Sequence, residues 1–422
     1  MNAKLLLLSL MVLYLPAFSQ KKADRALLED LAKHAGQMAA AQQGEASPGQ
    51  GVSAYIAAQF KAEGLQAGTS DSFLLPFAID EGRAFDASVL KVNQTNLQPG
   101  TDFFPLPYSA EKEARGEPLI SVQEPGNIWI VSISDLVQPA KDTSADGLQE
   151  QLYQAGRKAV QDKASGIIFY DTLADRLVPA PDPQTPRTAL TIPVVYVKKA
   201  AAARLFHDET ASADISMQVK FSERKTTLYN VAGYIDNKAA STVVLGACYP
   251  CPAKAESIDA SRTGSAATLI ELGKMLKESR YHRHNYLLVA FPERDTTKQQ
   301  WTSLLTASHI DTSRIGYIVH IGQLSGQDNA LQVAGINSAA QWKEALSKAK
   351  GRDIKLGDDP SATPGAAFYP GNVPALFLHG TAAPDANAGK DSEKDALSAI
   401  RLVYDLIGNL EKAGKLAYTG SY

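Results

Sequence analysis

Cysteine and unbalanced charge are both scarce in this chain of 422 residues. Only Cys248 and Cys251 occur, so no disulfide framework supports the fold and its hydrophobic core must suffice. Lys and Arg number 42 against 45 Asp and Glu, a formal charge of −3, and neither sign forms long blocks. This balance argues against a nucleic-acid partner and against a polybasic membrane-binding surface.

Several catalytic motifs are also missing. The sequence has no G-x-S-x-G, no H-E-x-x-H, no P-loop and no G-x-G-x-x-G. A serine-hydrolase elbow, a single-zinc protease helix, a phosphate-binding loop and a dinucleotide-binding turn are therefore all without support. Any chemistry has to come from residues that the fold brings together from separate segments.

The N-terminus carries the features of an export signal. Lys4 precedes the apolar run Leu5–Phe18, and Ala17-Phe18-Ser19 places small residues at a cleavage site. We therefore predict a signal peptide over residues 1–19, with the mature protein beginning near Gln20. The apolar run is short for a bilayer span, and no later stretch reaches about 18 uncharged apolar residues. The expected location is periplasmic or secreted, with no membrane association after cleavage.

The pattern of apolar residues along the sequence changes twice, which indicates that one domain is inserted into another. Residues 106–210 contain short β-rich runs around one helical stretch, 148–164, and a Pro-rich segment. Residues 20–105 and 211–422 would form the surrounding domain. Its second part alternates nearly continuous apolar strands with helices, which is typical of a sheet that helices cover on both faces. The predicted fold class is α/β, with a mixed, mainly parallel sheet sandwiched by helices and a β-rich insert.

Four apolar runs of the surrounding domain are strand candidates: Thr242–Leu245, Tyr286–Phe291, Tyr317–Ile321 and Val373–Leu378. Helices are predicted between or after them: Ser265–Glu278, Ala339–Ala349 and Lys394–Glu411. In open sheets of this kind, ligands bind at the carboxyl ends of the strands. The residues that follow these runs are therefore the candidates for chemistry.

The order of these segments resembles the M28 family of zinc aminopeptidases. The resemblance rests on residues 230–235 (Asn-Val-Ala-Gly-Tyr-Ile) leading to 243–247 (Val-Val-Leu-Gly-Ala), on the Gly-Ser-Ala-Ala helix start at 264–267, on 285–291 and on 372–377. The insert resembles a protease-associated (PA) domain, which some members carry. The resemblance implies a zinc-exopeptidase-like fold. In that family, two zinc ions share a bridging Asp and activate a water molecule for peptide hydrolysis.

Most of the family's metal-ligand positions are substituted in this sequence. The motif's first His, bridging Asp, ligand Glu, later Asp and last His fall, in that order, on Cys248, Asp259, Asp295, Gly322 and Asn387. Two further carboxylate positions fall on Pro250 and Ala260.

The family's general base is replaced as well. Its Glu falls on Arg294, and a slip of one residue puts Glu293 there but then places Arg294 in the ligand position. A guanidinium repels each unit of positive charge by about 4 kcal/mol at 4 Å and an effective dielectric of 20. We therefore expect the fold without the two-zinc centre, and no cofactor.

The two cysteines allow other interpretations. Cys248 and Cys251 could form a local disulfide in an exported protein. Alternatively, Cys248, Cys251, Asp259 and His320 could rebuild a single-zinc site, because His320 lies two residues before Gly322 on a strand and so points to the same side.

Three functions remain open at this point. The preferred hypothesis is an exported, non-catalytic relative, a pseudoenzyme that binds a peptide or protein in the former substrate cleft. The first alternative is an active metallo-aminopeptidase that uses zinc at an atypical site containing Asp259, Asp295, Cys248 and Glu293. The second is a metal or redox binder that uses the cysteines.

Overall fold

A computed structural model of the chain describes residues 3–42, 49–69, 71–120, 122–136, 145–170, 187–208, 210–251, 260–293, 300–304, 311–324, 331–349, 354–357, 372–380 and 392–419. The chain divides into two compact units. Unit 1 comprises Met1–Ile79 and Thr227–Tyr422, and unit 2 comprises Asp80–Thr226. Each unit has its own hydrophobic core.

Unit 1 is built on a sheet to which nine strands contribute in the described part. The strands are β1 (Gln66–Ala67), β2 (Leu74–Ala84), β11 (Ser222–Ile235), β12 (Ser241–Pro250), β13 (His284–Glu293), β14 (Ile315–Ile321), β15 (Leu331–Ala334), β16 (Ile354–Leu356) and β17 (Ala375–His379). Their order is β1-β11-β13-β12-β14-β17-β15-β16, and β2 pairs with β11. The four central strands β13, β12, β14 and β17 run parallel, whereas β11 and β15 pair antiparallel at either side of them. The four predicted strands correspond to this central group.

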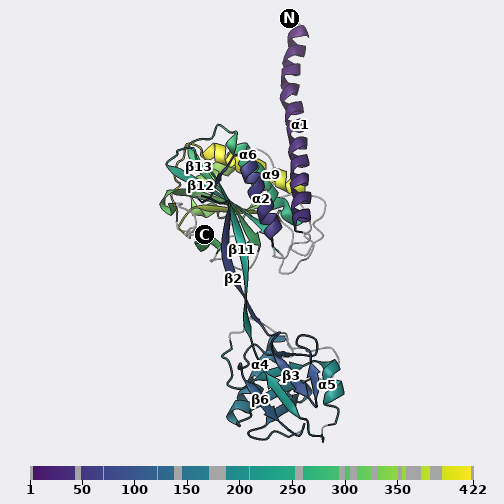
Figure 1. Ribbon diagram of the computed structural model, residues 1–422. Coiled ribbons are helices and arrows are strands. Elements are labelled where there is room, and N and C mark those ends of the chain that lie inside the picture. Colours follow the sequence, from purple (N-terminus) through teal and green to yellow (C-terminus); the bar gives the residue numbers. More distant parts are fainter. Residues whose placement is uncertain are drawn as a thin grey trace. The chain divides into compact units, whose positions relative to one another are not determined.

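The helices of unit 1 are α1 (Ala3–Ala41), α2 (Gln50–Ala62), α6 (Gly264–Lys277), α8 (Gln341–Lys348) and α9 (Ser392–Leu410). Apolar residues recur at helical spacing in each, as in Val52, Ile56 and Phe60 of α2. α9 carries acidic residues in its first turn, where they face the positive end of the helix dipole. Figure 1 shows α2, α6 and α9 beside the sheet.

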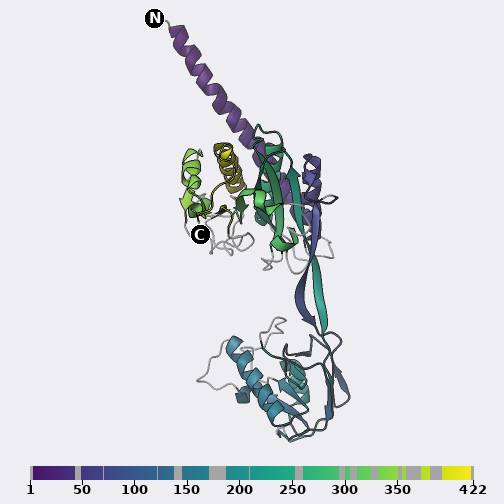
Figure 2. The ribbon, with the colours of Figure 1, turned by 90° about the vertical axis from the view of Figure 1, so that its left-hand side faces the viewer.

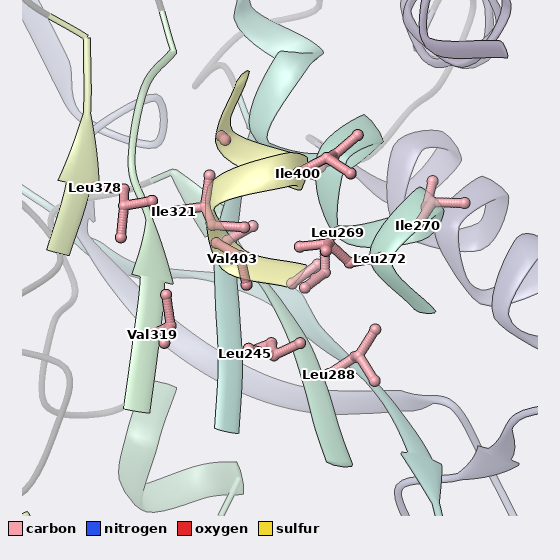
Figure 3. Packing of buried hydrophobic residues seen from close by; sticks show 14 of the residues in the cluster. Leu245, Leu269, Ile270, Leu272, Leu288, Val319, Ile321, Leu378, Ile400 and Val403 are labelled. Atoms are coloured by element: carbon pink, nitrogen blue, oxygen red, sulfur yellow. The ribbon is translucent and has the colours of Figure 1, made fainter. Parts of the chain in front are cut away.

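Side chains alternate strictly along the central strands, so the sheet has two buried faces. On one face, called the helix face here, Leu245, Leu288 and Val319 pack with side chains of all five helices. Figure 3 shows these residues directed toward Leu269 of α6 and Val403 of α9. On the other face, called the opposite face, the neighbouring strand residues pack in a separate cluster. That cluster includes the tryptophan and leucine of a helical stretch at 300–304.

Unit 2 contains two four-stranded sheets among its described residues. Its strands are β3 (Val89–Val92), β4 (Thr95–Leu97), β5 (Phe103–Pro105), β6 (Glu113–Gly116), β7 (Ile128–Ser132), β8 (Gly166–Tyr170), β9 (Val194–Val197) and β10 (Ile215–Gln218). One sheet has the antiparallel order β4-β3-β10-β6 and the other the order β5-β9-β8-β7. Helices α3 (Ile133–Leu136), α4 (Ala145–Gln161) and α5 (Lys199–Leu205) complete the unit. Leu148 and Leu152 of α4 pack on β8, beside which α4 lies in Figure 2.

The structure places the boundaries of unit 2 at Asp80 and Thr226 rather than at the predicted 106 and 210. The reason is strand pairing. Strand β3 pairs with β10, and β5 pairs with β9, so residues 89–105 complete the sheets of unit 2. These short strands are separated from their partners by about a hundred residues, which local sequence patterns do not reveal. The likeness of unit 2 to a PA domain stays a prediction.

The N-terminal helix is longer than predicted. The helical spacing of apolar residues from Leu27 to Met38 predicts a helix over 24–40. This stretch lies within α1, which runs without interruption from Ala3 to Ala41. In the part of the chain that the structure describes, no helix combines the length and apolar character needed to cross a membrane. The signal peptide over residues 1–19 stays a prediction.

Candidate functional site

The carboxyl ends of β12, β13, β14 and β17 lie at one edge of the sheet, called the carboxyl edge here, as parallel pairing requires. Of the predicted site residues, Cys248, Glu293, Gly322 and His320 are described there, together with Cys251. Asp259, Arg294, Asp295 and Asn387 lie outside the described residues. The geometry of the site is therefore built from the first group.

Cys248 and His320 contact each other on the opposite face. The Sγ atom of Cys248 lies 3.8 Å from Nε2 of His320, and the two strands are adjacent in parallel register. Burial, with a further contribution from the charge of Glu293, raises the pKa of the Cys248 thiol to about 12. Burial lowers the pKa of His320 to about 3. At neutral pH the pair is therefore a neutral thiol beside a neutral imidazole, not a thiolate beside an imidazolium.

Cys251 belongs to the other side of the sheet. It is 2% exposed and packs in the helix-face cluster, whereas Cys248 packs in the opposite-face cluster. Residues three apart on an extended strand point in opposite directions, which is why the C-x-x-C spacing separates the two sulfurs here. No disulfide joins the two cysteines in the described structure. The structure thus does not form the predicted disulfide, and it brings Cys248 and His320 together without Cys251.

A close backbone approach fixes the position of Cys251. Gly49, just before α2, has a left-handed backbone with φ of 70°. A Cβ atom at this position would lie 2.8 Å from the Sγ atom of Cys251. The missing side chain of Gly49 therefore makes the space that the Cys251 sulfur occupies.

Glu293, the candidate base after a one-residue slip, is held by an ion pair. Its Oε2 atom accepts a hydrogen bond from Nη2 of Arg262 at 3.0 Å, and both side chains are partly exposed. Arg262 lies in the short 3₁₀ helix η1 (Ala260–Thr263), directly before α6. Sequence reasoning missed Arg262, although its position two residues before the Gly-Ser-Ala-Ala helix start marks it as an edge residue. An ion pair with the Arg262 guanidinium therefore occupies the carboxylate of Glu293.

Gly322 stands where the M28 resemblance places a metal ligand, and the backbone around it leaves little room for a side chain. Its N–H donates to the carbonyl oxygen of Leu378 at 2.7 Å, and its own carbonyl oxygen accepts a hydrogen bond from Ser265 Oγ. A Cβ atom at Gly322 would lie 3.2 Å from the Leu378 oxygen and 3.4 Å from Cβ of His379. These contacts are tighter than ordinary van der Waals separations, so a carboxylate at this position requires a backbone shift.

The described donors do not fit a pair of zinc ions. Zinc takes deprotonated thiolates, neutral imidazoles and carboxylates, and two adjacent ions need several anionic ligands. Among its described residues, the carboxyl edge offers a protonated thiol, the imidazoles of His320 and His379, a glycine and a carboxylate paired with Arg262. Among the described residues, no three His, Cys, Asp or Glu side chains are grouped to hold a metal ion.

Comparison with solved structures identifies the class of fold. BSAP, a zinc aminopeptidase from Bacillus subtilis, matches with a TM-score of 0.50 and 14% identity over 94% of this chain and 98% of that chain. The aminopeptidase from Aneurinibacillus sp. strain AM-1 gives a TM-score of 0.46 at 14% identity, covering 94% and 95% of the two chains. A peptidase M28 precursor from Shewanella amazonensis SB2B gives 0.40 at 15% identity, covering 95% and 99%.

The likeness to BSAP shows that the chain has the fold of a zinc aminopeptidase, and the predicted zinc-exopeptidase-like α/β fold is confirmed. At 14% identity the likeness concerns the fold. No family model matches the sequence, and a search of curated protein sequences finds no match either.

Proposed function

We propose that this is an exported, peptidase-like protein without catalytic activity, a pseudoenzyme that binds a peptide or protein at the carboxyl edge of its sheet. The observation that carries the proposal is the neutral Cys248–His320 pair, with 3.8 Å between sulfur and nitrogen, where the M28 resemblance places the first zinc ligand. A site for two dications needs negative charge, and this pair supplies none at neutral pH.

Two structural features and one feature of the sequence further support the loss of catalysis. The acidic group nearest to the family's base position, Glu293, is paired with Arg262 at 3.0 Å. Gly322 stands at a predicted ligand position, where a Cβ atom would lie only 3.2 Å from the Leu378 oxygen. The base position itself is Arg294 in the sequence. Without a base and an activated water, hydrolysis of a peptide bond has no attacking group.

The ligand class and the location are supported by different features. BSAP is an aminopeptidase, an enzyme class whose substrates are peptides, and this chain shares its fold. A site that keeps its shape after losing its ions can still bind the same class of ligand. Export to the periplasm or beyond is supported by the apolar run and small residues at 1–19.

The decisive experiment measures turnover with the full mature protein. Aminoacyl p-nitroanilides and short peptides are incubated with the protein in buffer containing zinc, cobalt or manganese. We expect the protein to release no more p-nitroaniline or free amino acid than the matched variant Asp259→Ala, which lacks the aspartate that the M28 resemblance assigns to the metal site. Turnover that Asp259→Ala abolishes would overturn the proposal and support the active metallo-aminopeptidase.

Peptide binding needs its own measurement. The same peptides are titrated by fluorescence anisotropy against the wild type and against His320→Trp, which fills the opposite face beside Phe377. Binding that the bulky substitution weakens, with circular dichroism unchanged, supports the carboxyl edge as the ligand site. Equal affinity of both proteins for the peptide would show that the peptide binds at another site. No binding by either protein would contradict the proposal that the ligand is a peptide.

A second candidate function, binding of a single metal ion, is favoured by the same contact. Zinc–sulfur and zinc–nitrogen bonds of ordinary length in a tetrahedral site place the two donors about 3.6 Å apart. The observed separation of 3.8 Å is close to that value. Zinc content after dialysis decides between the candidates: we expect fewer than about 0.2 equivalents, whereas about one equivalent that Cys248→Ser removes would favour the metal binder.

A further inference from the structure

A basic groove lies at the other edge of the unit 1 sheet, where β12, β13 and β14 begin. It encloses about 520 Å³ and is formed by four segments far apart in the sequence: 237–241, 282–283, 313–314 and 411–415. All four belong to unit 1. This groove is distinct from the carboxyl edge, because parallel strands place their first and last residues at opposite edges of the sheet.

Hydrogen bonds between the segments hold the groove in shape. The side chain of buried Asn285, at the start of β13, accepts from the backbone N–H groups of Asn237 and Ala239 at 2.9 and 3.1 Å. Arg314 donates through Nη2 to the carbonyl oxygen of Ala239 at 2.6 Å and through Nε to that of Ala240 at 3.2 Å. The guanidinium is therefore fixed at the rim before any ligand arrives, which lowers the entropy cost of binding.

Hydrogen bonds also hold the segment 411–415 against the other segments of the groove. Lys415 donates through Nζ to the carbonyl oxygen of Ser313 at 2.8 Å, and Oε1 of Glu411 accepts from the backbone N–H of Arg283 at 2.9 Å. His284, buried beneath them, approaches the carbonyl oxygen of Leu410 at 3.4 Å. The four segments therefore form one cross-linked rim rather than a set of independent loops.

Positive charge is concentrated along this rim. Five of its residues are permanent cations, and they are Lys238, Arg283, Arg314, Lys412 and Lys415. Lys238 pairs with Asp236, whereas the other four form no ion pair with a carboxylate in the described part of the chain. The acids that act on the rim are Asp236, Asp311 and Glu411. Five cations against three carboxylates leave a positive groove in a protein whose net charge is −3.

We propose that this groove binds a small molecule through a phosphate or sulfate group. Guanidinium and ammonium donors that lack carboxylate partners suit an oxyanion, and a fixed arginine adds the planar donor geometry that such groups prefer. The groove is much larger than a bare oxyanion, so it also has room for the organic part of an ester. The site is independent of peptide binding at the carboxyl edge.

Isothermal titration calorimetry with the full mature protein tests the proposal, using pyrophosphate, phosphate, sulfate and acetate as probes. The test variant is the double substitution Arg283→Ala/Lys412→Ala, whose two exposed side chains make no hydrogen bond in the described structure. Its matched control is Lys33→Ala/Lys343→Ala, which removes two exposed cations from α1 and α8 of the same unit. Both proteins lose the same net charge, so only the position of the charge differs.

We expect pyrophosphate to bind more tightly than acetate and the double variant to weaken binding by about tenfold or more, while the control stays within about twofold of the wild type. Raising sodium chloride from about 0.05 to about 0.5 M should also weaken binding, because salt screens the attraction between the cations of the groove and the anion. A preference for phosphate over sulfate, or the reverse, identifies the ester class. Absence of binding to the wild type, or equal weakening in both double variants, would overturn the proposal.

Discussion

The two edges of the unit 1 sheet differ in the charge state of their described side chains. Of the described residues at the carboxyl edge, Cys248 and His320 are uncharged at neutral pH, and Glu293 is bound to Arg262. The other edge, where β12, β13 and β14 begin, is called the amino edge here. Four exposed cations at this edge have no carboxylate partner in the described structure. Among the described residues, exposed positive charge therefore gathers at the edge opposite to the one where this fold ordinarily places its ligands.

This difference shows that burial, rather than residue type, decides what a side chain can do. A cysteine and a histidine that the fold brings together suggest metal binding or nucleophilic chemistry when judged by residue type alone. Inside the sheet, desolvation removes the charged forms that such chemistry needs. Lysines and arginines in an exposed rim keep their charge and remain available for a ligand.

The largest effect should follow from forcing a carboxylate back into the carboxyl edge. Gly322→Asp places a charged group in a buried position whose Cβ site lies 3.2 Å from the Leu378 oxygen. We expect the free energy of unfolding to fall by about 3 to 5 kcal/mol, measured by urea denaturation. Gly322→Ala, which adds the crowding without the charge, should lose clearly less. Undiminished stability of Gly322→Asp would show that the edge accommodates a metal ligand after all.

The next effect concerns the cysteines. With the pKa of Cys248 raised to about 12 and Cys251 buried, alkylation by iodoacetamide at pH 8 should be roughly a hundredfold slower in the folded protein than in urea. Mass spectrometry follows the modification of each residue. Fast labelling of Cys248 in the folded state would contradict a neutral thiol, and a mass that increases on reduction would reveal a disulfide.

Acid should weaken the carboxyl edge through His320. Its pKa is about 3 in the folded protein and about 6.5 when unfolded, so below pH 6.5 the unfolded chain binds the additional proton. The contribution of this histidine is therefore fully present above pH 6.5 and declines as the pH falls toward 3. Between pH 7 and pH 5 we expect His320 to account for a loss of about 2 kcal/mol.

The variant His320→Gln should lack this part of the acid sensitivity, which urea denaturation at the two pH values measures. His282→Gln serves as the control, because His282 is exposed at the amino edge. A wild type and a His320→Gln variant with the same pH dependence would argue that His320 is not buried neutral.

The smallest effect tests the rim of the basic groove. Arg314→Met removes the hydrogen bonds to the carbonyl oxygens of Ala239 and Ala240, and we expect a loss of about 1 kcal/mol in the free energy of unfolding. Arg283→Met, at the same rim, should leave stability nearly unchanged, because its side chain makes no hydrogen bond in the described structure. Equal losses in both variants would show that Arg314 does not tie the segments together.

Much of the fold could be predicted from the sequence because its signals are local. Apolar runs such as Tyr286–Phe291 and the helical spacing of Val52, Ile56 and Phe60 recur every two or every three to four residues, and both periods survive in the structure. The extent of unit 2 could not be predicted in this way, because strands at 89–105 find their partners near 195 and 215, beyond the reach of any local pattern.

The candidate site was predictable only in part. The period of a strand was enough to place His320 on the side of Gly322, and its contact with Cys248 follows from the pairing of β12 with β14. The ion pair between Arg262 and Glu293 depends on η1 folding back toward the end of β13, which no spacing rule predicts. The basic groove was missed because each of its segments carries only one or two cations, too few to form a charge block.

The tight backbone around Gly322 has a consequence for any side chain at this position. The ligand that the M28 resemblance assigns to this position would need a side chain where Gly322 has none. The contacts with Leu378 and His379 make that addition costly unless the neighbouring strand moves first. A side chain at position 322 is therefore coupled to the position of β17, and a change that moves this strand has to come first.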